Sequence, residues 1–191
     1  MQDGEAPAAG ERRAGAPAAD APASPGRFAV RRARTADVRS IRALIDENVP
    51  SGRLLDKATV TLYEDIQEFR VACDDAGQVV GCGALHVMWE DLAEIRTIAV
   101  AGTHQRRGVG HEVVAALLET ARQLGVCRVF VLTFAVQFFA EHGFEEIKGD
   151  AAAPEVYAEL LRSYDEGIAE FLDLDRVKPN TLGNTRMLRW L

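Results

Sequence analysis

Several residue types are scarce in this sequence, and each scarcity excludes a class of protein. There are three cysteines in 191 residues, and their spacing matches neither a zinc site nor a disulfide framework. The four histidines form no His-x-x-x-His pair. A basic surplus is also missing, because the formal net charge is -7, which argues against a nucleic-acid-binding protein. The sequence therefore predicts no metal site and no nucleic-acid partner.

Long apolar runs are absent as well. No stretch approaches the roughly 18 consecutive apolar residues that a membrane-spanning helix needs. Arg12 and Arg13 are not followed by a leucine-rich stretch of the kind that an export signal contains. Cys73, Cys82 and Cys127 lie in apolar segments and are expected to be reduced. We therefore expect a soluble, cytoplasmic protein with no membrane partner.

The first 27 residues differ in composition from the rest of the chain. They contain four of the seven prolines and no aromatic or β-branched residue. Such a segment cannot bury enough apolar surface to offset the entropy lost on ordering. Residues 1–27 are therefore predicted to be a disordered tail, and residues 28–191 a single domain.

Apolar periodicity predicts the elements of that domain. Strands are expected at residues 28–33, 69–75, 78–89, 93–100 and 127–134, from Phe144 onward, and at 184–191. Helices are expected at 36–49, capped by Thr35, and at 59–69, 108–125, 136–143 and 154–172. The strand at 127–134 is continuously apolar, as strands in a parallel pair often are. This order predicts an α/β fold, a mixed sheet with helices on both faces.

A glycine motif, Gln-x-x-Gly-x-Gly, lies where the strand at 93–100 leads into the helix at 108–125. Gln105, Gly108 and Gly110 define it, and Arg106 and Arg107 occupy the two positions between. The first N–H groups of a helix and its dipole attract anions, and glycines let a diphosphate approach the backbone. The motif therefore predicts a diphosphate site. Glycines that only relieve packing at the helix start are the alternative.

Two better-known phosphate motifs do not fit this stretch. A dinucleotide fingerprint would need a third glycine where Val113 stands. A P-loop would need a Gly-Lys-Ser/Thr ending, which this segment lacks. The ligand is therefore expected to belong to another class.

The motif and its context resemble the GNAT superfamily of N-acetyltransferases. The family signature, Gln/Arg-x-x-Gly-x-Gly/Ala, follows the fourth strand, and a second family block is matched by "VFVLTF" and "FFAEHGF". The resemblance implies the family's mixed α/β fold and acetyl-CoA as co-substrate. The cofactor-binding residues that it implies are Ile98, Ala99, Val100, Gln105, Arg106, Arg107, Gly108, Val109 and Gly110.

Most of the folded part is also similar to the acetyltransferase module of N-acetylglutamate synthases, especially their short stand-alone form. The segments "VVGCGALHV", "EIRTIAV" and "VKPNTLGNTRML" carry this likeness. It implies direct transfer of acetyl to the α-amino group of L-glutamate, the first step of arginine biosynthesis. The alternatives are another amino acid or small amine as acceptor, or an acetyl-CoA-binding regulatory module. A homodimer is left open.

The likeness also implies roles for individual residues. Glu94, an acid in an otherwise apolar strand, matches a glutamate implicated as the catalytic base. The alternative is a structural salt bridge to Arg96, two residues on and nominally on the same face. At the position of Phe139, many relatives carry a tyrosine that acts as the general acid toward the departing thiolate. Phenylalanine cannot donate a proton. Thr133 or unassisted departure of the thiolate would have to replace it.

The two carboxylates of glutamate require cationic or amide partners. By position in the relatives, the expected substrate-binding residues are Lys57, Asn184, Thr185 and Arg186, with Arg96 as a further cation. Pairing with Glu94 is the favoured use of Arg96. For Lys57 and Arg186 the alternative is a solvated surface charge.

Overall fold

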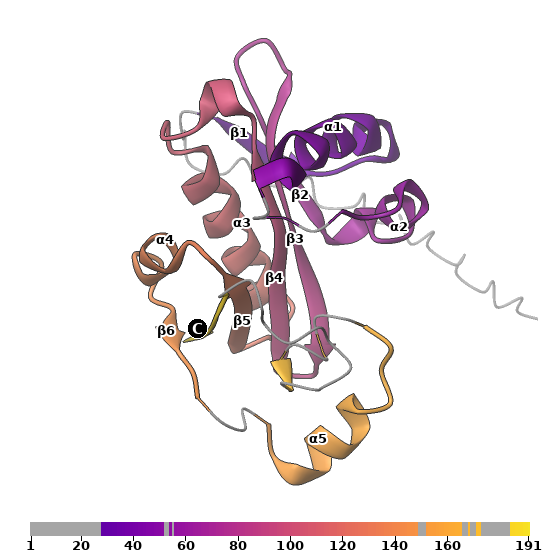
Figure 1. Ribbon diagram of the computed structural model, residues 1–191, viewed down its shortest axis with the longest axis vertical. Coiled ribbons are helices and arrows are strands. Elements are labelled where there is room, and N and C mark those ends of the chain that lie inside the picture. The colour runs from indigo at the N-terminus through magenta and orange to yellow at the C-terminus, as the bar shows by residue number, and fades with distance from the viewer. Residues whose placement is uncertain are drawn as a thin grey trace, which may run out of the picture.

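The computed structural model describes residues 28–51, 54, 56–148, 152–165, 168, 171–172 and 184–191. They form a seven-stranded sheet flanked by helices (Figure 1). The predicted tail, residues 1–27, lies outside the described residues. Among the helices of the described part, none combines the length and apolar character that crossing a bilayer requires.

The order of elements confirms the predicted α/β fold. The strands are β1 (Ala29–Arg32), β2 (Phe69–Cys73), β3 (Val79–Trp89), β4 (Leu92–Val100), β5 (Arg128–Thr133), β6 (Glu145–Glu146) and β7 (Thr185–Trp190). The helices are α1 (Val38–Asn48), α2 (Thr59–Glu64), α3 (Val109–Gln123), α4 (Val136–Ala140) and α5 (Pro154–Leu160). Figure 1 shows α1 and α2 on one side of the sheet and α3 and α4 on the other.

The sheet has the strand order β1-β2-β3-β4-β5-β7-β6, and β4 and β5 are parallel neighbours. All other neighbouring pairs are antiparallel. The β4–β5 register runs through Leu92 and Ala93 and ends at the pair of Glu94 with Phe130, although both strands are fully described. The strands therefore diverge beyond Glu94. We call their two diverging ends, Ile95–Val100 and Val131–Thr133, the fork.

Helix α3 packs closely on the sheet because β3 presents glycines to it. Its buried residues are Val109, Val113, Val114, Leu117, Leu118 and Ala121, at the spacing of one helical face. A β-carbon on Gly81 would lie 2.5 Å from Cγ1 of Val109, and one on Gly83 would lie 2.9 Å from Cγ1 of Val113. Side chains at these glycines would push the helix away. The start of α3 is thus held directly against β3.

A β-bulge in β4 changes which residues face α3. Cys82 pairs with Ala99 but Ala84 pairs with Arg96, so β4 contains one residue more than β3 between these pairs. Thr97 lies at this bulge with φ of +58°. As a result, odd-numbered Ile95 and even-numbered Ile98 both pack in the α3 core, whereas Ala99 packs in the core under α1 and α2.

Two sequence predictions about helix ends are wrong. Thr35 does not cap α1; it begins a 3-10 turn, η1 (Thr35–Asp37), and α1 starts at Val38. The Asp37 carboxylate satisfies this turn by accepting the backbone N–H of Arg34 at 2.7 Å. The second predicted helix likewise ends early, because α2 is followed by a separate 3-10 turn, η3 (Ile66–Glu68).

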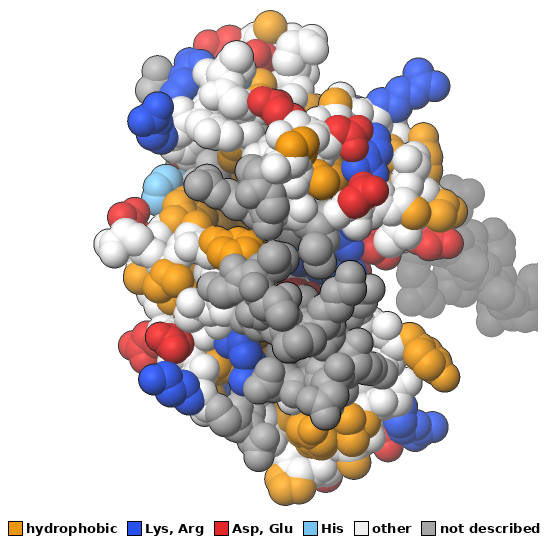
Figure 2. All heavy atoms as spheres, in the orientation of Figure 1, with side chains coloured by type: hydrophobic (Ala, Val, Ile, Leu, Met, Phe, Trp, Pro, Cys, Tyr) orange, Lys and Arg blue, Asp and Glu red, His pale blue; other side chains and the backbone are white. Residues whose placement is uncertain are grey.

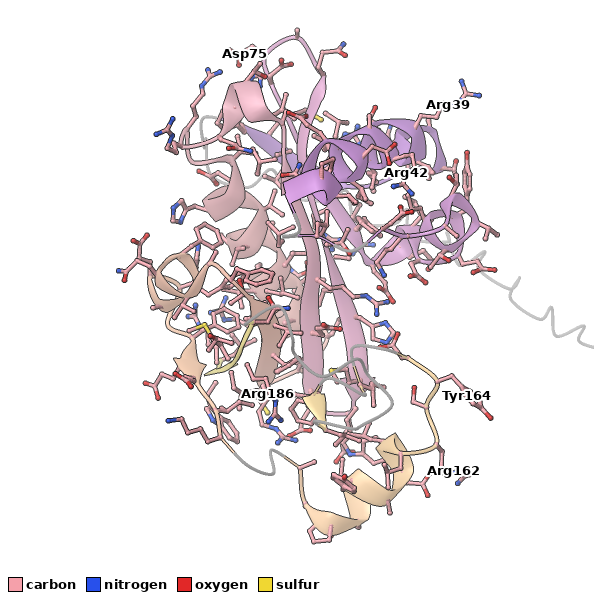
Figure 3. All side chains as sticks on the ribbon, in the orientation of Figure 1. Arg39, Arg42, Asp75, Arg162, Tyr164 and Arg186 are labelled. Carbon is pink, nitrogen blue, oxygen red and sulfur yellow. The ribbon has the colours of Figure 1, made fainter. Side chains whose placement is uncertain are left out.

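The predicted helix at 154–172 is interrupted after Leu160, although Ile168 and Phe171 are again helical. A turn follows α5, and Ser163–Asp165 are neither helix nor strand, while residues 166–167 and 169–170 lie outside the described residues. The Ser163 hydroxyl accepts the N–H of Asp165, and Oδ1 of Asp165 accepts the N–H of Ile168, both at 3.1 Å. Such local bonds compete with helical ones. Figure 3 shows Tyr164, in this break, pointing away from the molecule.

Candidate active site

The glycine motif forms a loop that is open to an anion. A 3-10 turn, η4 (Gly102–His104), leads into it, and α3 begins at Val109 with Gly108 as its N-cap. Arg106 and Gly108 have φ of +57° and +91°, and a β-carbon on Gly108 would meet no atom within 4 Å. The first amides of α3 have no acceptor inside the helix. They therefore offer hydrogen bonds to a ligand.

The side chains of this loop are largely exposed. Gln105, Arg106 and Arg107 are exposed, and Figure 2 shows basic side chains gathered over the segment that joins η4 to α3. The guanidinium carbon of Arg107 lies 5.8 Å from the ring centroid of Phe28, a cation–π arrangement. The loop thus adds positive charge to the helix dipole.

Gly110 differs from Gly108 in its surroundings. A β-carbon there would lie 3.3 Å from Cζ of Phe138, on α4. Packing at the helix start is therefore part of the reason for glycine at this position. At Gly108 the positive φ, rather than packing, favours glycine over other residues.

The three strand residues predicted to bind acetyl-CoA lie on the β4 side of the fork. Ile98 and Val100 pack against the α3 core, and Ala99 packs against the opposite one. Because β4 and β5 have separated here, the backbone groups of this stretch that face β5 are not used in β4–β5 pairing. The fork and the loop are consecutive in the chain, so a long ligand can contact both.

Glu94 lies at the base of the fork. It is the last β4 residue paired with β5, it is paired with His86 on β3, and it is 4% exposed. Its Oε2 lies 3.9 Å from Nη1 of Arg96. The structure therefore places the predicted base where the two strands part.

Arg96 forms ion pairs with several carboxylates, and the predicted pair with Glu94 has the longest distance among them. Arg96 donates to Oδ2 of Asp165 at 2.9 Å and to Oε2 of Glu68 at 3.0 Å, and it lies 3.4 Å from Oδ2 of Asp65. Arg96 therefore makes its shortest contacts with carboxylates outside β4. We call Asp65, Glu68, His86, Glu94, Arg96 and Asp165 the Arg96 cluster.

Sequence reasoning missed four members of the Arg96 cluster: Asp65, Glu68, His86 and Asp165. Nδ1 of His86 lies 2.6 Å from Oε1 of Glu68, and its Nε2 lies 3.6 Å from Oδ2 of Asp165. His86 could have been found, because it lies opposite Glu94 in the hairpin of β3 and β4. Asp165 is 69 residues from Arg96 and carries no local signal.

Titration within the Arg96 cluster is biased toward charged forms. The hydrogen bond to Glu68 raises the pKa of His86 above its ordinary 6.5, against the effects of burial and of Arg96. Burial acts to raise the pKa of Asp165, but the hydrogen bond and the charge of Arg96 outweigh it, so this pKa is lowered. The first shift favours the protonated form of His86 and the second favours the carboxylate form of Asp165, and these are the forms that make ion pairs.

The predicted substrate-binding residues come from two places. Lys57 is half-buried, and its carbonyl accepts a hydrogen bond from Arg42, which also pairs with Asp56 at 2.6 Å. Figure 3 shows Arg42 between α1 and α2, so it anchors the segment that carries Lys57. Whether the Lys57 side chain binds substrate stays a prediction.

The second place is the start of β7, next to the β5 side of the fork. Thr185 pairs with Thr133, Asn184 precedes it, and all three predicted residues there are half-buried. Arg186 donates to the carbonyl of Phe171, and Figure 3 shows it between the sheet and α5. Arg186 therefore has a structural contact beside its predicted role in substrate binding.

The acid step involves two positions with different surroundings: Phe139, where many relatives carry a tyrosine, and Thr133, the candidate that would replace it. Phe139 is buried in the α3 core, with ring centroids 5.1 Å from Phe138 and 5.3 Å from Phe144. Thr133 lies at the tip of the fork, and its hydroxyl oxygen accepts the N–H of Ala135 at 2.9 Å. Its hydroxyl proton is therefore not used in this hydrogen bond.

Across the described residues, no group of three His, Cys, Asp or Glu side chains is placed to hold a metal ion.

Comparison with known proteins adds a family and two kinds of relative. A sequence profile described as the Acetyltransferase (GNAT) family matches residues 31–144, from β1 to the residue before β6. An amino-acid acetyltransferase of Mycobacterium tuberculosis is 58% identical over 162 residues, which cover 83% of this chain and 92% of that protein.

Two solved structures have the same fold. A Mycobacterium tuberculosis protein in complex with CoA and NLQ matches with a TM-score of 0.80 and 57% identity, over 85% of this chain and 98% of that one. N-acetylglutamate synthase from Neisseria gonorrhoeae, complexed with coenzyme A and N-acetyl-glutamate, matches with a TM-score of 0.69 and 26% identity. That match covers 88% of this chain but 36% of the larger protein.

Proposed function

Because this chain belongs to the acetyltransferase (GNAT) family, we propose that it transfers the acetyl group of acetyl-CoA to the α-amino group of L-glutamate. The family match and the relative with 58% identity make it an acetyl-CoA-dependent enzyme that acetylates an amino acid. The choice of glutamate, and with it a place at the first step of arginine biosynthesis, is the proposal. It is supported by the Neisseria gonorrhoeae synthase that binds N-acetyl-glutamate.

The loop before α3 fits a diphosphate. Gly108 leaves open space beside the first amides of α3, and the exposed Arg106 adds positive charge. The β4 side of the fork offers backbone groups to the extended chain that follows the diphosphate in CoA. Acetyl-CoA, when bound, supplies the thioester. The fork would direct that thioester toward the point where β4 and β5 separate, which is where Glu94 lies.

The observation that carries the proposal is the surplus of negative charge at this end of the fork. The Arg96 cluster contains four carboxylates and one guanidinium, a net charge of -3 with His86 neutral and -2 with His86 protonated. A half-buried surplus of this kind favours a cationic ligand, because screening by water is incomplete. The α-ammonium group of an amino acid is such a ligand.

Glu94 would then act on the bound ammonium group. Its carboxylate takes one ammonium proton, directly or through water, and the freed amine attacks the thioester carbonyl. The carbon–nitrogen bond forms as the carbon–sulfur bond breaks, the electron pair leaves on sulfur, and the attacking nitrogen loses its second proton to solvent. The buried ring of Phe139 cannot protonate that thiolate, so the proton comes from Thr133 or from solvent.

The carboxylates of the amino acid would be bound at the two flanks of the fork. Lys57 would supply an ammonium from the α1–α2 segment, and Asn184, Thr185 and Arg186 would supply polar groups from β7.

An acceptor panel tests the proposal. Each of the twenty amino acids is incubated with the enzyme and acetyl-CoA, thiol release is followed, and the product is identified by mass spectrometry. We expect N-acetylglutamate as the main product and little release with D-glutamate. A different best acceptor would overturn the glutamate assignment, and tight acetyl-CoA binding without turnover would indicate a regulatory module.

A further inference from the structure

Arg96 is shared unequally among the carboxylates around it. The 2.9 Å and 3.0 Å contacts with Asp165 and Glu68 are charge-assisted hydrogen bonds, whereas the 3.9 Å contact with Glu94 is beyond hydrogen-bonding distance. The guanidinium is therefore bound away from Glu94 although it stands two residues along the same strand. Two carboxylates from outside β4 cause this arrangement.

The carboxylate of Asp165 is fixed from both sides. Its Oδ1 accepts the backbone N–H of Ile168 at 3.1 Å, and its Oδ2 accepts from Arg96 at 2.9 Å. Each oxygen has a separate partner, so the side chain cannot rotate without breaking one bond. Glu68 is fixed in a similar way, because its Oε1 contacts His86 while its Oε2 contacts Arg96.

The segment that carries Asp165 is packed on the strands beside Glu94. Ile168 and Phe171 are buried in an apolar cluster with Phe130, and the rings of Phe130 and Phe171 meet edge to face with centroids 5.2 Å apart. Phe130 is the β5 partner of Glu94. The packing of the segment after α5 therefore determines where the carboxylate of Asp165 stands relative to the base of the fork.

We infer that Asp165 and Glu68 are positioning residues that hold the Arg96 guanidinium off Glu94 and so preserve its ability to accept a proton. This inference rests on the proposed role of Glu94. A carboxylate in direct contact with a guanidinium has a strongly lowered pKa, which makes it a poor base. A general base works best when its pKa is near the working pH.

Within the described residues, the charged and titratable groups around Glu94 come from four parts of the chain. They are Arg96 on β4, His86 on β3, Asp65 and Glu68 at η3, and Asp165 after α5. Of these groups, Asp165 and Glu68 bind the guanidinium beside Glu94 at about 3 Å, closer than Glu94 itself does.

The test is the pH dependence of kcat/KM for Asp165→Asn. The amide oxygen can still accept the N–H of Ile168, but the negative charge that binds Arg96 is gone. Loss of that charge, and movement of Arg96 toward Glu94, both favour the deprotonated form of Glu94. We expect the acid limb of the profile to move to lower pH by about one unit, and the acetyl-CoA Kd to stay at the wild-type value.

Three variants complete the experiment. Asp75→Asn removes one negative charge from the exposed β2–β3 turn and should leave the limb in place. Asp165→Glu keeps the charge and should restore the limb even if it lowers the melting temperature. Glu68→Gln should move the limb in the same direction as Asp165→Asn, and it replaces that variant if Asp165→Asn does not fold.

The outcomes separate this inference from the proposed function. An unmoved limb in folded Asp165→Asn and Glu68→Gln, with only lower amplitude or stability, would overturn the inference. If Glu94→Gln keeps the wild-type limb, the base assignment itself fails. If Glu94→Gln loses the limb while Asp165→Asn leaves it in place, only the positioning role is wrong.

Discussion

Phe138 lies directly against Gly110, so that a β-carbon on this glycine would come within 3.3 Å of Cζ of the ring. The contact joins the first turn of α3 to α4, next to the loop at residues 105–110. Packing therefore favours glycine at this position, and our proposal adds access of a diphosphate to the first helical amides. A substitution must separate these two effects before it can be interpreted.

The first prediction concerns this pair. Gly110→Asp should weaken acetyl-CoA binding at least tenfold, about 1.4 kcal/mol, because its carboxylate blocks the loop and repels a diphosphate. Phe138→Ala in the same chain removes the clash, and the affinity loss should persist in the double variant. Calorimetric titration of both proteins measures it. Recovery of affinity in the double variant would mean that packing alone explains the glycine.

A second pair of glycines separates backbone strain from ligand binding. Gly108 and Gly77 both have positive φ, +91° and +75°, and a β-carbon on either would meet nothing within 4 Å. Alanine at each should cost about 1 kcal/mol of unfolding free energy. Only Gly108→Ala should also weaken acetyl-CoA binding, since Gly77 lies in the turn between β2 and β3. Equal losses of affinity in both variants would show that stability, not the loop, governs binding.

His86 should make the stability of the fold depend on pH. Its folded-state pKa is raised by the hydrogen bond to Glu68, so its stabilising contribution is complete below the unfolded value near 6.5. That contribution is lost as pH rises through the higher folded value. The difference in unfolding free energy between wild type and His86→Gln should therefore shrink from pH 5.5 upward to pH 8.5. Urea denaturation across this range measures it, and a constant difference would contradict the prediction.

Much of the fold could be predicted because each element carries its own apolar period. The buried face of α3 repeats at helical spacing, and the continuous apolar run of β5 is explained by its place between β4 and β7. The bulge at Thr97 could not be predicted, because β4 has the composition of an uninterrupted strand. The extra residue is visible only in the pairing with β3. The break after α5 could not be predicted either, because the apolar residues keep helical spacing through it.

The candidate site likewise has a part that the sequence predicts and a part that only the fold reveals. Residues 105–110 are contiguous, so the sequence alone is enough to predict a loop between β4 and α3. That this loop binds a diphosphate stays a prediction. The Arg96 cluster could not be predicted, because its members come from η3, β3, β4 and the segment after α5. The sequence therefore suggested an isolated pair of Glu94 with Arg96, whereas the fold surrounds that arginine with carboxylates that compete for it.

The most direct test of the proposed chemistry is the pH–rate profile of Glu94→Gln. Glutamine preserves the shape of this buried side chain but cannot accept a proton at neutral pH. We predict a loss in kcat of roughly 10²–10⁴-fold, with wild-type acetyl-CoA affinity and melting temperature, and partial recovery at high pH where more free amine is present. A well-folded Glu94→Gln enzyme with near-normal kcat at pH 7 would contradict the assignment of Glu94 as the base.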